Sequence, residues 1–179
     1  AQIENNQQIV TMSKSLGDML RYSIEYERDE EKLKTEVMHI RQYINIQEIR
    51  FGNQIQVDLD ISGELLEAKV LKFMLQPVVE NAVLHGISPK RDGGKVDIYA
   101  ENHGEKITIF VVDNGNGFPK EVLKRPRDKD STVGSEMGLR ITDRRIKQYY
   151  GEDYGLEVVK SDYSGSTVSI TISKSLISR

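Results

Sequence analysis

The chain has 179 residues and a formal net charge of −3, a size that allows one domain with an extra element, or two small domains. It contains no cysteine, which excludes disulfide scaffolds, thiol catalysis and zinc sites built on cysteine. The mild acidity gives no electrostatic reason to expect nucleic acid or an anionic membrane surface as a partner, and no apolar run approaches the ~18 residues of a membrane-spanning helix.

Two amphipathic helices are expected at the N-terminal end. Apolar residues spaced for one helical face recur over residues 3–26, and a second set follows at spacings of four, three and four, at Leu33, Val37, Ile40 and Ile44. Asp29 stands in position to cap the second helix. Three arrangements would bury these seams: a homodimeric four-helix arrangement, packing on the following domain, and a plain hairpin within one monomer.

An α+β domain is predicted for the rest of the chain. Alternating apolar and polar residues predict strands at 55–61, 96–100, 107–111, 155–161 and 166–173. Helices are predicted at roughly 65–86, where Pro77 should kink the helix or restart it, and at 138–150. The polar connection at 114–137 is long for an ordered loop and typical of a functional or mobile segment. This order of elements predicts helices on one face of a mixed, mostly antiparallel sheet.

Polar residues lie on the margin of a predicted buried helix face. Apolar residues recur at spacings of four, three and four from residue 71 to residue 82, and Glu80 and Asn81 lie at the edge of that stripe. His85 follows Asn81 by four residues, one turn along the same side. A core helix with a polar edge and a glycine cap explains the pattern as well as a functional site does.

Asp113 is the most informative single residue. It continues the inward-facing positions of the strand at 107–111, so its carboxylate should point toward the apolar side, where burial is costly without hydrogen bonds. Such a group suits a ligand with an exocyclic amino donor, such as adenine, although a turn aspartate satisfied by its own loop amides is an alternative. A calcium loop is excluded, because Gly115 and Gly117 occupy oxygen-ligand positions and Lys124 replaces the bidentate glutamate.

A glycine-rich turn precedes the helix predicted at 138–150. Gly134, Gly138 and Leu139 stand where free backbone N–H groups could meet a phosphate, and a flexible loop entering a helix is the alternative. The sequence contains neither a P-loop motif nor a dinucleotide-binding glycine fingerprint.

The motifs together resemble a known family. In order, the chain carries Glu80-Asn81-Ala-x-x-His85-Gly86, Asp113-x-Gly115-x-Gly117, Gly134-x-x-x-Gly138-Leu139 and Gly165-Ser166-Thr167. This series resembles the N box, the two glycine boxes and the terminal box of the GHKL ATP-binding fold. Within that superfamily the chain resembles sensor histidine kinases of the LytS/YesM-like group of bacterial two-component systems, and residues 20–23, 43–47 and 50–52 resemble that group's linker helices.

The resemblance covers essentially the whole chain and implies its organisation. It implies a GHKL (Bergerat) α/β sandwich over residues 53–179 as the ATP-binding catalytic domain. Residues 1–52 would form a partial two-helix dimerisation and linker region without the phosphoacceptor helix.

It also implies roles for the adenine-binding residues. Asp113 would accept a hydrogen bond from the adenine amino group, beside the glycine turn of Gly115 and Gly117. Gly117 would let the backbone approach the base, and Ser166 or Thr167 would help through a water molecule.

Further roles concern the phosphates. Asn81 would bind Mg²⁺, Glu80 would polarise or deprotonate the attacking imidazole, and His85 would lie near the phosphates or the ribose. Residues 119–137 would form a mobile ATP lid that includes Gly134. The amides near Gly138 and Leu139 would meet phosphate.

Two departures from the family pattern are evident. Glu136 replaces the usual middle glycine of the second glycine box, which puts a carboxylate near phosphate. The family's acceptor histidine lies in a Pro-His-Phe-Leu-type motif, and none of His39, His85 and His103 has that context. We interpret His39 as a surface histidine and expect this chain to bind ATP without phosphorylating itself at the usual site.

The implied function is that of the catalytic part of a protein histidine kinase, with ATP and Mg²⁺ as cofactors. The γ-phosphate would pass to a histidine of the dimerisation helix and then to a response-regulator aspartate. The expected partners are a second copy of the chain through the N-terminal helices and a response regulator, with no nucleic acid. The chain would be the cytoplasmic part of a cell-membrane protein, attached only through further N-terminal segments.

Two alternatives stay open at this point. Glu136 and the helical seam are compatible with a degenerate, nucleotide-poor dimerising scaffold. A GHKL ATPase of the gyrase, Hsp90 or MutL kind shares the boxes, and it is disfavoured because such proteins do not begin with this linker.

Overall fold

The computed structural model describes residues 29–51, 54–87, 93–118 and 135–174, with four isolated positions at Val10, Ser13, Lys14 and Gly17. The helix expected at 3–26 and the expected lid up to residue 134 lie outside the described residues. The elements follow in the order β1 (Glu30–Lys32), α2 (Leu33–Phe51), β2 (Ile55–Asp60), α3 (Gly63–Leu66), β3 (Lys69–Leu71), α4 (Gln76–Asn81), the π-helical segment η1 (Ala82–Ile87), β4 (Gly94–His103), β5 (Lys106–Asp113), α6 (Ser135–Tyr150), β6 (Gly155–Asp162) and β7 (Gly165–Ser173).

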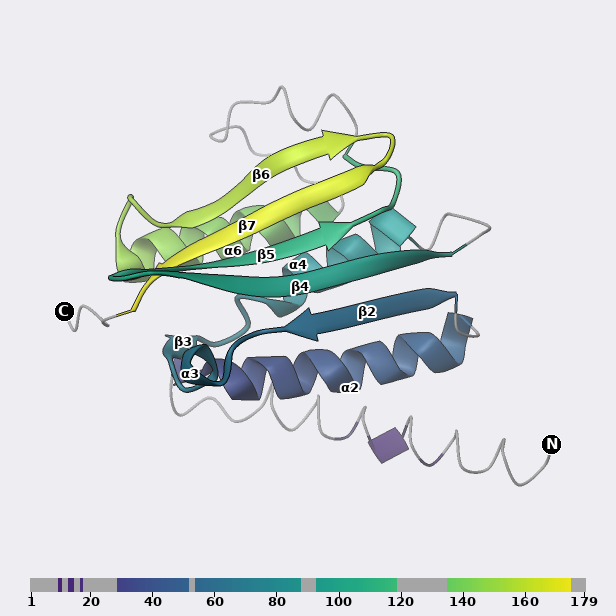
Figure 1. The fold of residues 1–179 in the computed structure, drawn as a ribbon, viewed down its shortest axis with the longest axis horizontal. Coiled ribbons are helices and arrows are strands. Elements are labelled where there is room, and N and C mark those ends of the chain that lie inside the picture. The colour runs from purple at the N-terminus through teal and green to yellow at the C-terminus, as the bar shows by residue number, and fades with distance from the viewer. Residues whose placement is uncertain are drawn as a thin grey trace.

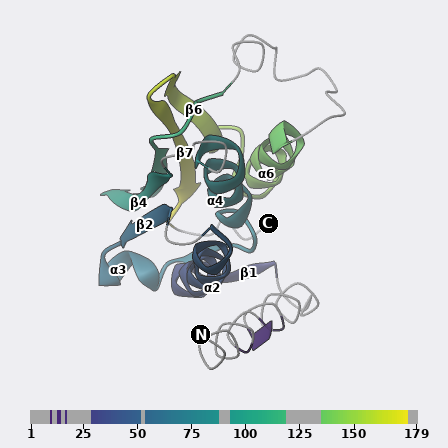
Figure 2. The same ribbon diagram turned by 90° about the vertical axis from the view of Figure 1, so that its right-hand side faces the viewer.

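A five-stranded mixed sheet forms the centre of the molecule, as predicted. Its order is β2-β4-β5-β7-β6, in which only the β2–β4 pair is parallel. Helices α4 and α6 cover one face of this sheet, and α2 lies beside α4 next to the edge strand β2 (Figures 1 and 2). None of the described helices is both long and apolar enough to cross a bilayer.

The core lies between the sheet and these helices. Alternate residues of β4, β5 and β7 point inward and are almost completely buried, among them Ile98, Ile109 and Ile170. They meet apolar residues of α4, η1 and α6, such as Val79 and Ile146. Because residues on one sheet face recur every second position, the inward side of β5 ends at Asp113.

The prediction of a single helix at 65–86 is wrong for residues 67–75. Helix α3 ends at Leu66, and Lys69–Leu71 forms strand β3, which pairs with β1 in antiparallel register. Phe73 then takes a left-handed conformation with φ of 60°, so the chain turns before α4. The restart expected at Pro77 is confirmed, because this proline lies in the first turn of α4, where its missing N–H leaves no hydrogen bond unmade.

Helix α2 packs on the domain that follows it. Its four seam residues are buried, as predicted, and the helix contacts β2, α3 and α4. Asp29 does not cap it, because β1 intervenes and the Asp29 carbonyl accepts the Lys72 N–H at 2.8 Å. His39 is also not a surface residue: it lies on the packed side of α2, is 8% exposed, and places its Nδ1 3.1 Å from Gln42 Oε1.

Glu36 joins α2 to the start of α4. Its side chain is 2% exposed, and its two oxygens accept the N–H groups of Phe73 at 2.8 Å and Leu75 at 3.1 Å. On the other side of this turn, Arg145 of α6 donates to the Lys72 carbonyl at 3.0 Å. The carboxylate thus pairs two backbone donors just before α4, at the end of the helix where a negative charge interacts favourably with the helix dipole.

The substitution Glu36→Gln should lower the free energy of unfolding by about 1–3 kcal/mol, because an amide offers one acceptor oxygen where two N–H donors are buried. Urea denaturation followed by circular dichroism measures this change. Glu48→Gln, farther along the same helix, is the matched control and should change stability by less than about 0.5 kcal/mol. Equal stability of the Glu36 variant and the unsubstituted chain would contradict the anchoring role.

Glu31 in β1 makes stability depend on pH. Burial, reinforced by the neighbouring Glu36 carboxylate and opposed by Lys72, raises the pKa of Glu31 from 4.5 to about 8. A carboxyl group whose pKa is raised in the folded state stabilises the fold fully below its unfolded pKa. That contribution is lost as the pH rises through the folded pKa. Between pH 4.5 and about 8, rising pH therefore weakens the fold through this group.

The substitution Glu31→Gln should remove this pH dependence, since glutamine imitates the protonated carboxyl group at every pH. The free energy of unfolding of the variant, minus that of the unsubstituted chain, should be larger at pH 8 than at pH 5. Denaturant unfolding of both proteins at the two pH values gives the comparison, with the exposed Glu157→Gln as control. The same change between pH 5 and pH 8 in both proteins would refute the assignment.

Candidate active site

Asp113 lies at the end of β5 on the inner face of the sheet, as predicted. Its side chain is 5% exposed. Its Oδ1 accepts the Gly115 N–H at 2.8 Å, and its Oδ2 accepts the Ser166 hydroxyl. Cross-strand register places Val96 and Ser166 directly beside it on β4 and β7. The turn hydrogen bond considered as an alternative is therefore present, but it accounts for only one of the two carboxylate oxygens.

Glycines allow the backbone to close around this carboxylate. A Cβ atom on Gly86 would lie 2.8 Å from Asp113 Oδ1, and one on Gly115 would lie 2.3 Å from the Gly86 carbonyl group. Gly117 has φ of 69°, and a Cβ there would lie 2.3 Å from the Asp162 carbonyl oxygen. The end of η1 thus packs directly on the loop after β5, in contacts that no larger residue could make.

Asn81 at the end of α4 has an unusual environment. Its side chain is 7% exposed, and its Oδ1 is buried with no hydrogen-bond partner among the described residues. Buried polar atoms are almost always paired. An unpaired amide oxygen is also a suitable ligand for a hard cation such as Mg²⁺, so the residue fits the metal-binding role that the resemblance implies.

Glu80 and His85 differ from Asn81 in exposure. Glu80 is half-buried, and its Oε1 accepts a hydrogen bond from Gln76 Nε2 at 2.7 Å. His85 is exposed and lies in the π-helical segment η1. Asn81 is only 7% exposed, so these two residues, four positions apart, lie in different environments.

The start of α6 contributes backbone amides. The helix begins at Ser135, so the N–H of Gly138 belongs to its first four, which have no intrahelical acceptor. Gly138 faces Pro77 at the start of α4. The Leu139 side chain is buried in the core at 6% exposure. Gly134 and the side chain of Glu136 lie outside the described residues.

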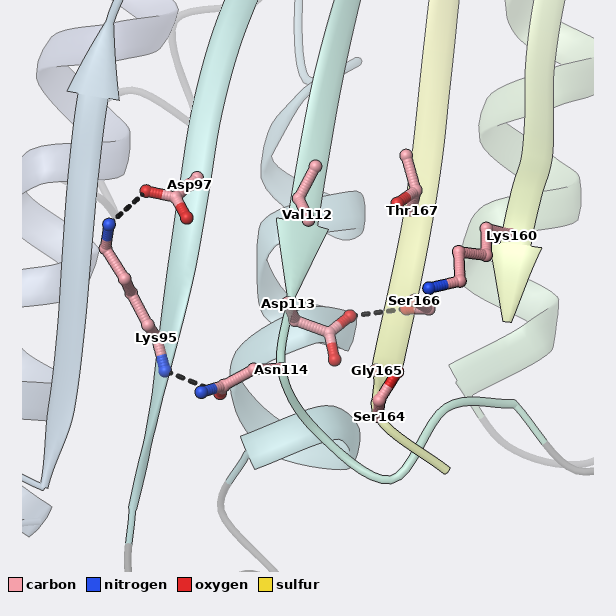
Figure 3. A pocket seen from close by; sticks show the side chains of 10 residues that line it. All are labelled: Lys95, Asp97, Val112, Asp113, Asn114, Lys160, Ser164, Gly165, Ser166 and Thr167. Carbon is pink, nitrogen blue, oxygen red and sulfur yellow. Dashed lines mark hydrogen bonds and ion pairs between the residues drawn. The ribbon is translucent and has the colours of Figure 1, made fainter. Parts of the chain in front are cut away.

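A cavity of about 220 Å³ lies at the same end of the sheet, and Asp113 and Ser166 line it together with outward-facing residues (Figure 3). Asp97, Val112 and Thr167 occupy matching positions on three neighbouring strands and belong to the opposite sheet face from Asp113. Of the two residues proposed to assist at the base, the structure therefore brings Ser166 to the Asp113 carboxylate and places Thr167 on the other face.

Two glycines that belong to the motifs but carried no predicted role are also part of this geometry. Gly86 touches the Asp113 carboxylate, and Gly165, with φ of 131°, approaches the Asp113 carbonyl more closely than a Cβ would allow. Their place inside the glycine-containing motifs was the signal that could have identified them. Tyr43 of α2 was part of a linker motif, and nothing in that motif indicated that its hydroxyl is buried without a partner among the described residues.

Two family models match the chain. Residues 67–176 match the model described as histidine kinase-, DNA gyrase B- and HSP90-like ATPase, and residues 1–55 match the model described as histidine kinase.

Curated relatives are sensor histidine kinases. The chain is 36% identical over 139 residues to sensor histidine kinase YpdA of Escherichia coli K12, covering 77% of this chain and 24% of that protein. It is 33% identical over 172 residues to sensor histidine kinase YesM of Bacillus subtilis 168, covering 96% of this chain and 29% of that protein. The chain thus spans less than a third of the length of these two relatives.

Solved structures show the same fold at low sequence identity. The histidine kinase domain of the blue-light activated kinase of Erythrobacter litoralis EL346 superposes with a TM-score of 0.59 at 17% identity, covering 96% of this chain and 81% of that one. The catalytic domain of histidine kinase ThkA gives a TM-score of 0.59 at 20% identity, covering 81% and 94%. With the family models and relatives, these findings show that the chain belongs to the sensor histidine kinase family and carries its GHKL-type ATPase domain.

Proposed function

We propose that this chain is the ATP-binding catalytic part of a sensor histidine kinase, which positions the γ-phosphate of Mg-ATP for transfer to a histidine. The observation that supports the proposal most directly is the buried Asp113 carboxylate. It stands at the end of an inner strand, is oriented by Ser166 and Gly115, and is closely approached by the backbone at Gly86.

Asp113 is suited to recognise adenine. An ionised carboxylate has about four acceptor sites on its two oxygens, so the contacts with Gly115 and Ser166 leave capacity for an exocyclic amino donor. The two protein donors also hold the carboxylate in one orientation, which reduces the entropy lost when the base binds. The flanking glycines let the backbone pack closely around this carboxylate.

Asn81 is the residue that we assign to Mg²⁺. Among the residues that the structure describes, no three His, Cys, Asp or Glu side chains gather into a metal site of their own. Mg²⁺ characteristically uses one or two protein ligands together with substrate phosphates. When bound in this way, it would neutralise charge on the transferred phosphate.

Glu80 lies next to Asn81 and is the group that we assign to the attacking imidazole. A carboxylate that accepts the imidazole N–H orients the ring and stabilises the positive charge that develops on it. The N-terminal amides of α6 face the same region and favour phosphate oxygens. Exposed His85 would contact phosphate or ribose from the solvent side.

Partners of the intact protein are proposed by analogy. A structure similar to this chain, with a TM-score of 0.57 at 21% identity, is described as histidine kinase ThkA in complex with response regulator TrrA. We infer that this chain also acts with a response regulator. We further infer that it forms a homodimer through the region 1–52. Within that region the seam of α2 is already buried inside the chain. Attachment to a membrane would come from segments outside the chain.

The substitution Asp113→Asn should weaken ATP binding about tenfold or more, because it replaces an acceptor oxygen and removes a charge-assisted hydrogen bond to the adenine amino group. Isothermal titration of Mg-ATP into the chain and the variant measures the change. Asp97→Asn, on the outer sheet face, is the matched control and should bind ATP normally. Equal affinity of the Asp113 variant would overturn the adenine assignment, and no ATP binding by the unsubstituted chain would favour the scaffold alternative.

The substitution Asn81→Ala should remove the dependence of ATP affinity on Mg²⁺. The unsubstituted chain should bind ATP more tightly with Mg²⁺ than with a chelator, whereas the variant should bind equally in both conditions. Asn102→Ala is a suitable control, because that exposed side chain lies near the turn between β4 and β5, at the opposite end of β5 from Asp113. A variant that still responds to Mg²⁺ like the original chain would argue against Asn81 as the ligand.

A further inference from the structure

Helix α2 carries two buried side-chain oxygen atoms that have no hydrogen-bond partner among the described residues. Tyr43 is 5% exposed and Gln47 is 8% exposed, and they lie one turn apart on the same side of the helix. Neither Tyr43 Oη nor Gln47 Oε1 has a hydrogen-bond partner within the described part of the chain. A buried tyrosine hydroxyl normally finds one, so these atoms call for a physical explanation.

The neighbouring charge on the opposite helix is Glu80. Burial raises the pKa of Tyr43, the Glu80 carboxylate raises it further, and Arg50 opposes the shift. The Glu80 carboxylate is thus one of the charges that act on the phenol. The Glu36 contacts with Phe73 and Leu75 place an earlier part of α2 at the start of α4. Helices α2 and α4 contact each other and run from left to right in Figure 1. Tyr43 lies about two turns after Glu36 on α2, and Glu80 about one and a half turns after Leu75 on α4, so the two residues are at similar positions along the helix pair.

The chemistry of the atoms distinguishes Tyr43 from Gln47. Tyr43 has a hydroxyl proton to donate, whereas the unpaired atom of Gln47 is a carbonyl oxygen that repels a carboxylate. Glu80 holds one oxygen on Gln76 at 2.7 Å, and a carboxylate accepts through both oxygens. The donor without an acceptor and the carboxylate are therefore complementary neighbours.

We propose that Tyr43 is a positioning residue for Glu80, with its hydroxyl donating a hydrogen bond to the Glu80 carboxylate when nucleotide is bound. The inference rests on the proposed function, because Glu80 matters only where a phosphoryl group is transferred. The bond would fix the carboxylate between two donors, Gln76 on its own helix and Tyr43 on the linker helix. The carboxylate would then face the incoming imidazole in one orientation.

Tyr43→Phe separates this role from a structural one. If Tyr43 only fills space, removing a buried unpaired hydroxyl leaves activity unchanged and raises stability slightly or not at all. If it positions Glu80, kcat for phosphoryl transfer to an added phosphoacceptor helix should fall about tenfold, the effect of losing one hydrogen bond to a charged group. The KM for ATP should not rise, and the thermal midpoint should not fall.

Tyr150→Phe is the matched control. Tyr150 is also a buried tyrosine, but its hydroxyl accepts the Leu71 N–H at 3.0 Å. This variant should lower the thermal midpoint and leave kcat unchanged. A Tyr43 variant with unchanged kcat, or one whose loss of kcat is matched by lower stability and weaker ATP binding, would overturn the proposal.

A spectroscopic measurement tests the contact in the chain itself. The eight tyrosines can be labelled with ¹³C at the ring carbon that bears the hydroxyl, and Tyr43→Phe identifies the Tyr43 signal. Adding Mg²⁺ and a non-hydrolysable ATP analogue should shift that signal downfield, and the shift should disappear in Glu80→Ala.

Each outcome of this experiment decides between the two claims. A bound analogue with no shift, or a shift that persists in Glu80→Ala, overturns the Tyr43 inference and leaves ATP binding intact. Failure of the analogue to bind at all refutes the proposed function, and the inference with it.

Discussion

The Glu36 carboxylate holds the helix on which the site depends. Helix α4 has only six residues, and a helix this short does not persist in water on its own. Its start follows a left-handed Phe73, a conformation that costs a non-glycine residue about 1–2 kcal/mol. The N–H groups of Phe73 and Leu75, just before the helix, donate to the Glu36 carboxylate. The positions of Glu80 and Asn81, one turn later, therefore depend on a side chain from the preceding helix.

The sheet fixes the other half of the site. Strand register places Asp113 between Val96 and Ser166 on the inner face, so one neighbour is apolar and the other supplies a hydroxyl. A buried carboxylate is costly without hydrogen bonds, and its two protein donors offset that cost. The site thus combines a rigid acceptor on the sheet with an unpaired amide oxygen on a helix, two elements held together by glycine contacts at Gly86 and Gly115.

Local pattern was sufficient for the sheet and for part of the site. Alternation predicted the strands, and its period of two correctly placed Asp113 inward. The restart at Pro77 followed from the chemistry of proline. The pattern failed at residues 67–75, because apolar spacing there suits a helix as well as a strand, and the strand exists only because distant β1 pairs with it.

Other features of the site depend on tertiary packing, which the local sequence pattern does not reveal. The choice between Ser166 and Thr167 depends on the register of β7 against β5, which two adjacent hydroxyl residues do not reveal. The burial of His39 and Tyr43 arises from packing between α2 and the following domain. A heptad-like seam is equally compatible with packing against a second chain, so its pattern does not identify the partner.

The pairing of β1 with β3 restricts how this protein can move. Residues 30–32 hydrogen-bond to residues 69–71, and Glu36 and the buried face of α2 follow immediately. A pivot inside residues 29–51 would have to break backbone pairs and expose a buried carboxylate together with apolar side chains. Helix α2 and the proposed ATP site are therefore expected to move together as one rigid unit. Any force applied to α2 reaches α4 without an intervening joint.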